Sequence, residues 1–256
     1  MEINKKQKNI AVIFAGGIGQ RMGAELPKQF MKIYGKEIII HTIEKFQYHK
    51  EIDAIYIGCK EEYIPLLKTL ITKYNLNKVP KDGIVAGGET GLDTIYNILK
   101  KVEEDNFSNS IVLIHDGVRP MITEEVITNN IDDTKKYGSS ITCTPCFETP
   151  FITNDGIHID EIIPRNKMYT AQAPQCFILN DILSAHEIVR NSEDGYNNPS
   201  IVDSCSLMKS IKKEVHLTIG NRGNIKVTTV QDYINLLSQF TIEDQKQILS
   251  LIERKN

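Results

Sequence analysis

Residues 10–30 read IAVIFAGGIGQRMGAELPKQF, and the rest of the sequence is organised around this stretch. The apolar run 10–14 is too short for a typical helix and rich in β-branched residues, so we expect a buried β-strand there. Small residues follow the run, and they are Ala15, Gly16, Gly17 and Gly19. Such residues let the backbone turn tightly and approach a ligand, and the N–H groups of the turn can converge on an anion. Arg21 and Lys28 add two cations, so the stretch predicts a polyphosphate site.

Two better-known phosphate motifs do not fit this stretch. A dinucleotide fingerprint requires G-x-G-x-x-G, but Met22 occupies the position of the third glycine, which also argues against a dehydrogenase. A P-loop requires G-x-x-x-x-G-K-[ST], but Gly23 is followed by Ala24 instead of lysine. The alternative to a phosphate site is a plain strand-to-helix turn that carries two solvated cations.

The composition is that of an ordinary globular protein, with 41% hydrophobic and 25% charged residues among 256. This length lies within the range of a single α/β domain. A net charge of −3 carries no signature of nucleic-acid or membrane binding. No apolar run approaches the roughly 18 residues of a membrane span, and the N-terminal residues lack the apolar region of a signal peptide. We therefore expect no nucleic-acid partner and no membrane partner.

The cysteines and histidines give no sign of a metal or redox centre. Five cysteines, an odd number, are scattered along the chain, which is typical of reduced thiols and favours a cytoplasmic location. Cys143 and Cys146 have CxxC spacing, but no second pair accompanies them, so we interpret them as packing residues. His41 and His115 are interpreted as packing or surface residues.

Apolar runs alternate with segments of helical spacing over the first half of the chain. Strands are expected at 10–14, 53–59, 78–86 and 110–115, and helices at 37–47, 61–74, 91–102 and 124–137. The strands lack polar alternation, which predicts a doubly wound α/β fold with a mainly parallel sheet covered on both faces. Ligands collect at the carboxyl ends of the strands in such sheets. Three candidate segments fall at that edge, namely 15–28, 87–88 and 116–120.

Residues 139–165 change to short alternating runs on either side of Asn154-Asp155-Gly156, a turn signal typical of a hairpin. We expect a β-arm that protrudes from the sheet. Because such an arm cannot bury both of its faces alone, it favours a homodimer.

The remaining elements are expected after residue 200. Strands are expected at 215–219 and 224–228, and helices at 230–238 and 241–254. Thr241 and Asp244 form a possible capping box for the last helix. We assign residues 1–240 to one domain and residues 241–256 to a C-terminal helix.

Five motifs in order resemble the IspD/TarI family of CTP-dependent cytidylyltransferases. They are AGGIGQRM, LPKQF, DGVRP, TAQAPQCF and GNIKVTTVQDY, and they lie between residues 10 and 235. The resemblance implies a Rossmann-like nucleotidyltransferase fold with a protruding β-arm, a homodimer, and CTP with a small polyol phosphate as substrates. In the implied reaction an acceptor phosphate oxygen attacks the α-phosphorus of CTP and pyrophosphate leaves. Such a reaction depends on alignment and on cations around the developing negative charge.

The resemblance also implies roles for individual residues. Catalytic cations are Arg21, Lys28 and Lys226. Residues expected to bind the nucleotide are Phe14, Ala15, Gly16, Gly17, Gly19, Gly87, Thr94, Asp116 and Gly117. Asp116 would hold Mg²⁺ or the ribose, since one or two carboxylates commonly hold Mg²⁺ beside phosphates. Arg165 would bind the acceptor phosphate from the arm through its guanidinium. Arg119 is a candidate for the acceptor as well, although an ion pair with Asp116 is the favoured interpretation.

The sequence departs from the family pattern at several positions. Gly91 replaces an arginine of the cytosine-reading loop, while at positions that face the acceptor in the methylerythritol enzymes Ala173 replaces a threonine and Gly223 an aspartate, and their Thr-Asp-Glu segment falls at 201–204. A site that has lost such polar groups is not expected to keep its specificity for one polyol. We therefore favour ribitol 5-phosphate as the acceptor, with 2-C-methyl-D-erythritol 4-phosphate as the alternative and another phosphorylated acceptor as the third. A CTP-binding regulator without turnover is the alternative from another functional class.

Overall fold

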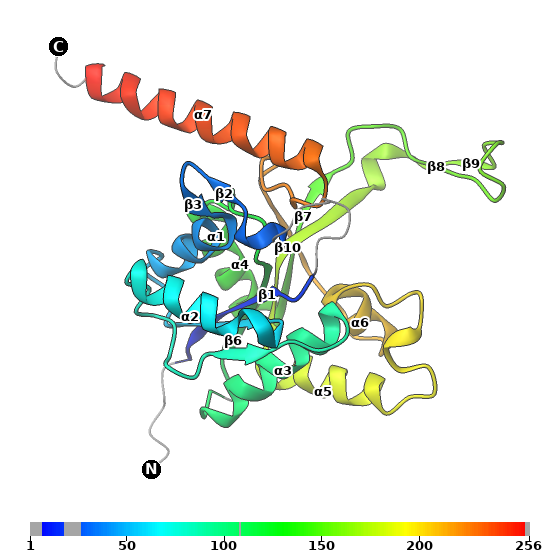
Figure 1. The fold of residues 1–256 in the computed structure, drawn as a ribbon. Coiled ribbons are helices and arrows are strands. Elements are labelled where there is room, and N and C mark those ends of the chain that lie inside the picture. The colour runs from blue at the N-terminus through cyan, green and yellow to red at the C-terminus, as the bar shows by residue number, and fades with distance from the viewer. Residues whose placement is uncertain (1–6, 18–26, 108, 254–256) are drawn as a thin grey trace.

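A computed structural model of the chain describes residues 7–17, 27–107 and 109–253, with side chains up to residue 243. Within these residues the centre of the fold is a 7-stranded sheet (Figure 1). In order across the sheet its strands are β11 (Leu217–Ile219), β7 (Ser139–Pro145), β10 (Tyr169–Ile178), β6 (Ile111–Asp116), β1 (Asn9–Ala15), β4 (Ala54–Cys59) and β5 (Ile84–Ala86). β10 runs antiparallel to both of its neighbours, and the other paired strands are parallel.

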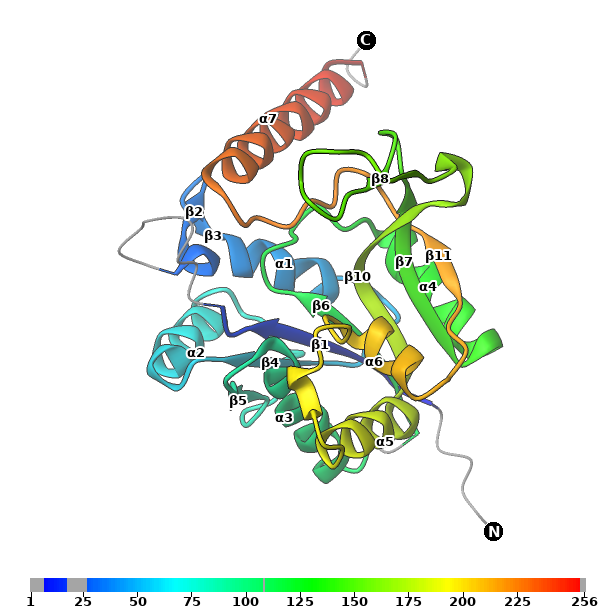
Figure 2. The ribbon, with the colours of Figure 1, turned by 90° about the vertical axis from the view of Figure 1, so that its right-hand side faces the viewer.

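The sheet is buried on both faces, which explains why its strands are apolar without alternation. In β1, Ile10 and Val12 pack into one hydrophobic cluster, whereas Ala11 and Ile13 pack into the other. Helices α1 (Ile38–Gln47), α2 (Ile64–Lys73) and α4 (Glu124–Tyr137) contribute to the cluster on one face. Helices α3 (Gly91–Glu104), α5 (Leu179–Arg190) and α6 (Ser204–Ser210) contribute to the cluster on the other (Figure 2). The predicted doubly wound α/β fold is confirmed.

The chain changes direction across the sheet beside β1. From β1 it continues to β4 and β5 on one side, and it then returns to β6 on the other side. A crevice at the carboxyl ends of the strands is expected at such a switch point. In the register of the sheet, Phe14 at the end of β1 is level with Gly58 of β4 and Asp116 of β6. This edge is where the sequence predicts the ligand.

The β-arm is a hairpin of β8 (Phe151–Ile152) and β9 (Glu161–Ile162) that projects away from the sheet in Figure 1. Gly156 in its turn has a φ of +73°, a left-handed conformation that favours glycine. The arm starts later than predicted, because 139–145 is β7 and lies in the central sheet. A second small sheet pairs β2 (Lys32–Ile33) with β3 (Lys36–Glu37).

Several other predictions were wrong. Residues 224–228 form no strand, and of 78–86 only the last three residues do. The two helices expected after residue 229 are one continuous helix, α7 (Val230–Glu253). Thr241 is not an N-cap, because its hydroxyl donates to the carbonyl of Leu237 within that helix. None of the helices in the described parts of the chain is both long enough and apolar enough to span a membrane.

Candidate active site

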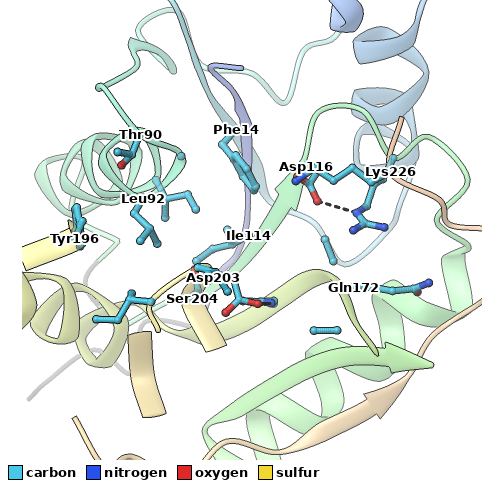
Figure 3. A pocket seen from close by; sticks show the side chains of 18 residues that line it. Phe14, Thr90, Leu92, Ile114, Asp116, Gln172, Tyr196, Asp203, Ser204 and Lys226 are labelled. Carbon is cyan, nitrogen blue, oxygen red and sulfur yellow. Dashed lines mark hydrogen bonds and ion pairs between the residues drawn. The ribbon is translucent and has the colours of Figure 1, made fainter. Parts of the chain in front are cut away.

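Two cavities open at the carboxyl edge of the sheet. The larger has a volume of about 410 Å³ and the smaller about 280 Å³. The smaller is lined by the start of the glycine-rich turn, by Lys28 and by residues 88–91. The larger extends toward β10 and α6 (Figure 3). Both cavities are lined by Phe14, Thr90, Gly91, Asp116 and Lys226.

Asp116 carries the charge at this shared wall. Its Oδ2 accepts a hydrogen bond from Arg119 Nε at 2.7 Å, and its Oδ1 lies 2.5 Å from Lys226 Nζ. Burial acts to raise the pKa of Asp116, but the two cations outweigh burial and hold the pKa below its ordinary value. Asp116 is therefore an anion at neutral pH, and the pair with Arg119 that the sequence favoured is present. Because the two cations exceed the one anion, the wall has an excess of positive charge.

Lys226 is aimed at the cavities by its neighbours in the chain. Val227 is fully buried against α7, and its N–H donates to the carbonyl of Val118. Adjacent side chains of an extended segment point in opposite directions, so Lys226 turns to the site. Its side chain is 41% exposed, and its Nζ lies 5.7 Å from the centre of the Phe14 ring. Because Lys226 is partly exposed and held by one ion pair, its ammonium group is able to move from Asp116 to a nearby phosphate.

The start of the glycine-rich turn packs closely around Thr94. A Cβ on Gly16, or on Gly87, would lie 2.9 Å from Thr94 Oγ1, which explains why both positions are glycine. The hydroxyl accepts from the Gly88 N–H at 3.1 Å and donates to the Thr90 carbonyl at 3.0 Å. Thr94 thus joins the turn after β1 to the turn after β5, and its predicted contact with the nucleotide stays a prediction.

Further bonds fix the end of β1. Gln29 is buried and donates to the Ala15 carbonyl at 2.8 Å. Gly117 donates its N–H to the Phe14 carbonyl at 3.0 Å. Gly17 is exposed and lines the smaller cavity together with Gly16. These bonds leave the ring of Phe14 and the backbone of the turn facing the site.

Two predicted site residues, Gly19 and Arg21, lie outside the described residues. Lys28 is described and lines the smaller cavity. Arg165 lies on the arm, where it donates to the Phe147 carbonyl at 3.0 Å, and it lines neither cavity. Its predicted contact with the acceptor phosphate stays a prediction.

The first turn of α3 is tied to the loop after α5 by Arg190. Thr90 and Asp93 form a capping box at the start of α3. Arg190 donates to Asp93 at 2.6 Å, and its guanidinium lies 4.5 Å from the ring centre of Tyr96 and 5.5 Å from that of Tyr196. Burial raises the pKa of Tyr196 to about 12, so the phenol stays neutral. Tyr196 lines the larger cavity, and Arg190 holds it there.

β10 and α6 form the remaining wall of the larger cavity. The pairing of β10 with β7 changes register between Ala171 and Gln175. Alternate residues of a regular strand face opposite sides, so this irregularity allows residues 171–173 all to line the cavity. Gln175 Nε2 donates to Asp203 Oδ2 at 2.7 Å, and Gln175 Oε1 accepts from the Cys205 N–H at 2.8 Å. One buried glutamine thus fixes the start of α6 against the sheet.

These wall residues were not assigned by sequence reasoning. Asp203 and Ser206 have the spacing of a capping box, and that signal would have predicted α6. Nothing in the local pattern of β10 indicated that it pairs with β6. The positions of Gln172 and Gln175 in the wall depend on the pairing of β10. Ser204 is placed by the bonds of Gln175 to the start of α6, and Tyr196 by its contact with Arg190.

A metal ion would find one carboxylate at the shared wall. In the described parts of the chain, no group of three or more His, Cys, Asp or Glu side chains is suited to hold a metal. Mg²⁺ usually takes one or two carboxylates and completes its shell with phosphate oxygens and water. Asp116 fits this role when Lys226 leaves Oδ1, because Arg119 already occupies the other oxygen.

Comparison with known proteins agrees with this geometry. The model of a family described as IspD, 2-C-methyl-D-erythritol 4-phosphate cytidylyltransferase, matches residues 9–243. The ribitol-5-phosphate cytidylyltransferase of Vibrio parahaemolyticus serotype O3:K6 is 42% identical over 241 residues, covering 94% of this chain and 99% of that protein. The 2-C-methyl-D-erythritol 4-phosphate cytidylyltransferase of Clostridium botulinum (strain ATCC 19397 / Type A) is 37% identical over 227 residues, covering 89% and 95%.

A solved structure has the same fold over nearly the whole chain. The 4-diphosphocytidyl-2C-methyl-D-erythritol synthase from Anaerococcus prevotii DSM 20548 matches with a TM-score of 0.79 and 27% identity, covering 92% of this chain and 96% of that one. The chain therefore belongs to the IspD family and is a CTP-dependent cytidylyltransferase. The family expected from the five motifs is confirmed.

Proposed function

We propose that this IspD-family cytidylyltransferase transfers CMP from CTP to ribitol 5-phosphate and releases pyrophosphate. The observation that carries the proposal is the wall shared by the two cavities, because Asp116 and Lys226 line both. A nucleotide in the smaller cavity and an acceptor phosphate in the larger one would meet at the same lysine. Transfer between two phosphates requires such a meeting point.

The proposed step forms one P–O bond and breaks another. An oxygen of the acceptor phosphate attacks the α-phosphorus of CTP, and the bond from that phosphorus to the α–β bridging oxygen breaks, so pyrophosphate leaves with the electron pair. The backbone of the glycine turn and Lys28 hold the triphosphate. Lys226 moves from Asp116 to the α-phosphate and offsets the negative charge of the two approaching phosphates. Arg21 is assigned to the leaving pyrophosphate by family resemblance.

We extend the proposal to Mg²⁺ at Asp116. The ion would neutralise the phosphates of CTP and favour departure of pyrophosphate. Asp116 would release Lys226 as it takes the ion, while Arg119 keeps the carboxylate in place. The family resemblance and the anionic state of Asp116 support this assignment.

Ribitol 5-phosphate is favoured over the methylerythritol substrate by two observations. The Vibrio parahaemolyticus relative named for ribitol 5-phosphate shares 42% identity, compared with 37% for the Clostridium botulinum relative named for the methylerythritol substrate. Ala173 and Val202, which replace polar residues of the methylerythritol pattern, both line the larger cavity. These changes fall where the acceptor would lie.

The test is pyrophosphate release from CTP and Mg²⁺ with three acceptors at equal concentration. Ribitol 5-phosphate is expected to react at least 10-fold faster than 2-C-methyl-D-erythritol 4-phosphate, and glycerol 3-phosphate slower still, given the losses expected for a mismatched polyol. ATP, GTP and UTP serve as nucleotide controls. A preference for the methylerythritol substrate would contradict the proposed acceptor. CTP binding in calorimetry with no turnover of any acceptor would instead identify a regulator.

We also propose a homodimer formed through the arm, working in the cytoplasm, where CTP is available. Four arm residues are strongly exposed apolar side chains: Phe151 (53%), Ile157 (82%), Ile159 (58%) and Ile162 (65%). Apolar groups gathered on a protruding hairpin are typical of a protein–protein contact. We propose that Arg165, on the arm, binds the acceptor phosphate, an assignment that the family resemblance supports. The free thiols of all five cysteines are consistent with a reducing compartment.

Light scattering coupled to gel filtration tests the dimer. The protein is expected to have twice the chain mass of 29.0 kDa. The double variant Ile157→Asp/Ile162→Asp is expected to be a monomer. Ile188→Asp, at a residue of α5 that is 53% exposed, is the matched control and should stay dimeric. A monomeric unmodified protein would contradict the proposal.

A further inference from the structure

Lys226 lies on the segment 221–227, which hydrogen bonds fix to the loop after β6. The amide of Asn221 and the N–H of Val227 both donate to backbone carbonyls of residues 118–121, at 2.9 and 3.1 Å. The position of Lys226 is therefore tied to the carboxyl end of β6.

The bend of β10 at residues 171–175 uses side chains for its hydrogen bonds. Its pairing with β7 changes register there, so the carbonyls of the bend find partners outside the regular ladder. The carbonyl of Ala173 accepts from Asn224 Nδ2 at 2.9 Å, and that of Pro174 accepts from Thr142 Oγ1 at 2.6 Å. Because residues 171–173 line the larger cavity, these bonds hold the backbone of the wall proposed for the acceptor.

Asn224 connects this wall to the ion pair of the catalytic lysine. While its amide holds Ala173, its backbone carbonyl accepts from Arg119 Nη1 at 2.8 Å. The same guanidinium donates through Nε to Asp116 at 2.7 Å, and Asp116 is the partner of Lys226. One residue thus bridges the bend of β10 and the group that holds Lys226.

Asn224 has no route to a substrate of its own. It is 0% exposed and lines neither cavity. Its Oδ1 is buried and has no hydrogen-bond partner among the described residues, and an unpaired buried oxygen costs free energy. Positions where a sequence accepts such a cost are typically ones that serve function. The amide at this position therefore indicates a role in the geometry of the site.

The reaction is sensitive to that geometry. The attacking oxygen, the α-phosphorus and the bridging oxygen must lie in line. A misplacement of about 1 Å can lower the rate about 10²-fold, even when its cause is far from the reacting atoms. In the proposed arrangement the acceptor lies against β10, whereas Lys226 is carried by the segment 221–227. The separation of these two parts of the chain therefore decides whether the reactants are aligned.

We propose that Asn224 is a positioning residue, which sets the separation between the acceptor wall of β10 and Lys226. The inference rests on the proposed function, because it uses the proposed role of Lys226. It does not depend on which polyol phosphate is the acceptor. Asn224 acts through Lys226 and Ala173, and it touches neither substrate.

The first experiment is Asn224→Leu, which keeps the size of the side chain and removes the amide. This variant is expected to lower kcat about 30-fold, with a change of less than twofold in the KM for CTP. Steady-state pyrophosphate release with the best acceptor measures both values. Urea unfolding checks the fold. If Asn224→Leu does not fold, Asn224→Ala, which also lacks the donor and adds no apolar bulk, takes its place.

Thr142→Val is the matched control. Thr142 is also fully buried, and its hydroxyl bonds to the neighbouring carbonyl of β10 from the opposite side, in β7. Because its bond does not involve the segment 221–227, β10 stays tied to Lys226 when it is removed. This variant is expected to lower kcat less than threefold.

A double-variant cycle shows whether Asn224 acts through Lys226. Residues that act as a unit give non-additive losses. Asn224→Leu is therefore expected to lower kcat less than about threefold when it is added to Lys226→Met, compared with about 30-fold in the unmodified chain. A residue that merely supports the fold would give the same factor in both backgrounds.

Three results would overturn the inference and leave the proposed function standing. They are an unchanged kcat in Asn224→Leu, an equal loss in Thr142→Val, and equal factors in the two backgrounds of the cycle. An unmodified enzyme that turns over no acceptor would instead end the proposed function, and the inference with it. The two failures are therefore distinguishable.

Discussion

The two sides of the site are built by different means. On the side of the smaller cavity, the proposed nucleotide side, bonds to and between backbone atoms fix the geometry: β1 and β6 are paired in register up to Phe14 and Asp116, and the Gly117 N–H donates to the Phe14 carbonyl. On the side of the larger cavity, the proposed acceptor side, side chains from separate segments fix it, as in the bond from Gln175 to Asp203. A nucleotide site built from backbone survives many substitutions, whereas an acceptor site built from side chains changes with each one.

The largest loss of activity is expected on substitution of Lys226, because this residue lines both cavities and is proposed to serve both sides. Lys226→Met should lower kcat/KM about 10² to 10³-fold for every acceptor, because the charge on the approaching phosphates is then not offset. Steady-state pyrophosphate release measures it. Lys213→Met, at an exposed lysine away from the cavities, is the control. A loss confined to ribitol 5-phosphate would place Lys226 on the acceptor side alone.

Acid is expected to lower the free energy of unfolding of the whole protein, and so to affect both sides of the site alike. Burial lowers the pKa of His115, beside Asp116, to about 4 and that of His186, which bonds to Tyr196, to about 3. Each unfolded histidine has a pKa near 6.5, so the unfolded chain binds protons that the folded chain does not. The stabilisation is complete above pH 6.5 and is lost as the pH falls from there toward 4 or 3. We expect a loss of about 2 kcal/mol per histidine at pH 5.

Urea unfolding at pH 7 and pH 5 measures this loss. The pKa values of His41 and His49 are also lowered by burial, so they add to the loss in the same direction. His186→Asn should remove its own share of the pH dependence and leave that of His115. An unfolding free energy that does not change between the two pH values would show that the two buried histidines are protonated as easily as in the unfolded chain.

Thr94 should affect the nucleotide side alone. Thr94→Val removes the acceptor of the Gly88 N–H, and an unpaired N–H of this kind costs ~1–3 kcal/mol. We expect the KM for CTP to rise about 10-fold while the KM for the acceptor changes less than twofold. Thr69→Val is the control, because Thr69 makes the same bond to the carbonyl four residues earlier, in α2. Equal changes in both KM values would show that the two sides are not separable.

The smallest effect is expected at Arg190, where the two sides meet. Its side chain is 39% exposed, so its ion pair with Asp93 contributes little, and its contact with the Tyr196 ring is worth ~0.5–1 kcal/mol. Arg190→Met should raise the KM for the acceptor about 3-fold. Lys100→Met, which removes an exposed contact between the same two helices, should leave both KM values unchanged. An unchanged acceptor KM in Arg190→Met would show that Tyr196 needs no such support.

The same contrast explains what could be predicted from the sequence. The apolar run before the glycines predicted β1, and the segment 124–137 predicted α4 with the bounds that the structure has. These elements are decided by local pattern. β10 was not predicted, because it contains a proline and polar residues, and it becomes a strand only through pairing with β6 and β7.

Two errors have the same physical origin. Ile225 and Val227 alternate with polar residues as in a strand, but one bond from Val227 to Val118 does not make a ladder. Thr241 has the sequence of an N-cap, but α7 continues through it, and the Thr241 hydroxyl meets the Tyr34 hydroxyl at 2.7 Å. In both cases contacts with distant residues decided the structure. The acceptor side depends most on contacts between distant residues. The sequence therefore showed which positions differ from the family pattern, but it did not show which cavity those positions line.

The direction of β10 has a consequence for how acceptor choice is inherited. Because β10 runs against the other strands, the chain coming from the arm reaches the larger cavity before it enters the core. The wall that β10, the loop after α5 and the start of α6 give to that cavity therefore comes from one segment of the chain, residues 171–204, while the residues that line the smaller cavity are scattered from Phe14 to Thr228. One recombination event could therefore replace this whole wall of the larger cavity. The residues of the smaller cavity could be replaced only one at a time, so a change of acceptor can evolve while the residues proposed to bind the nucleotide stay the same.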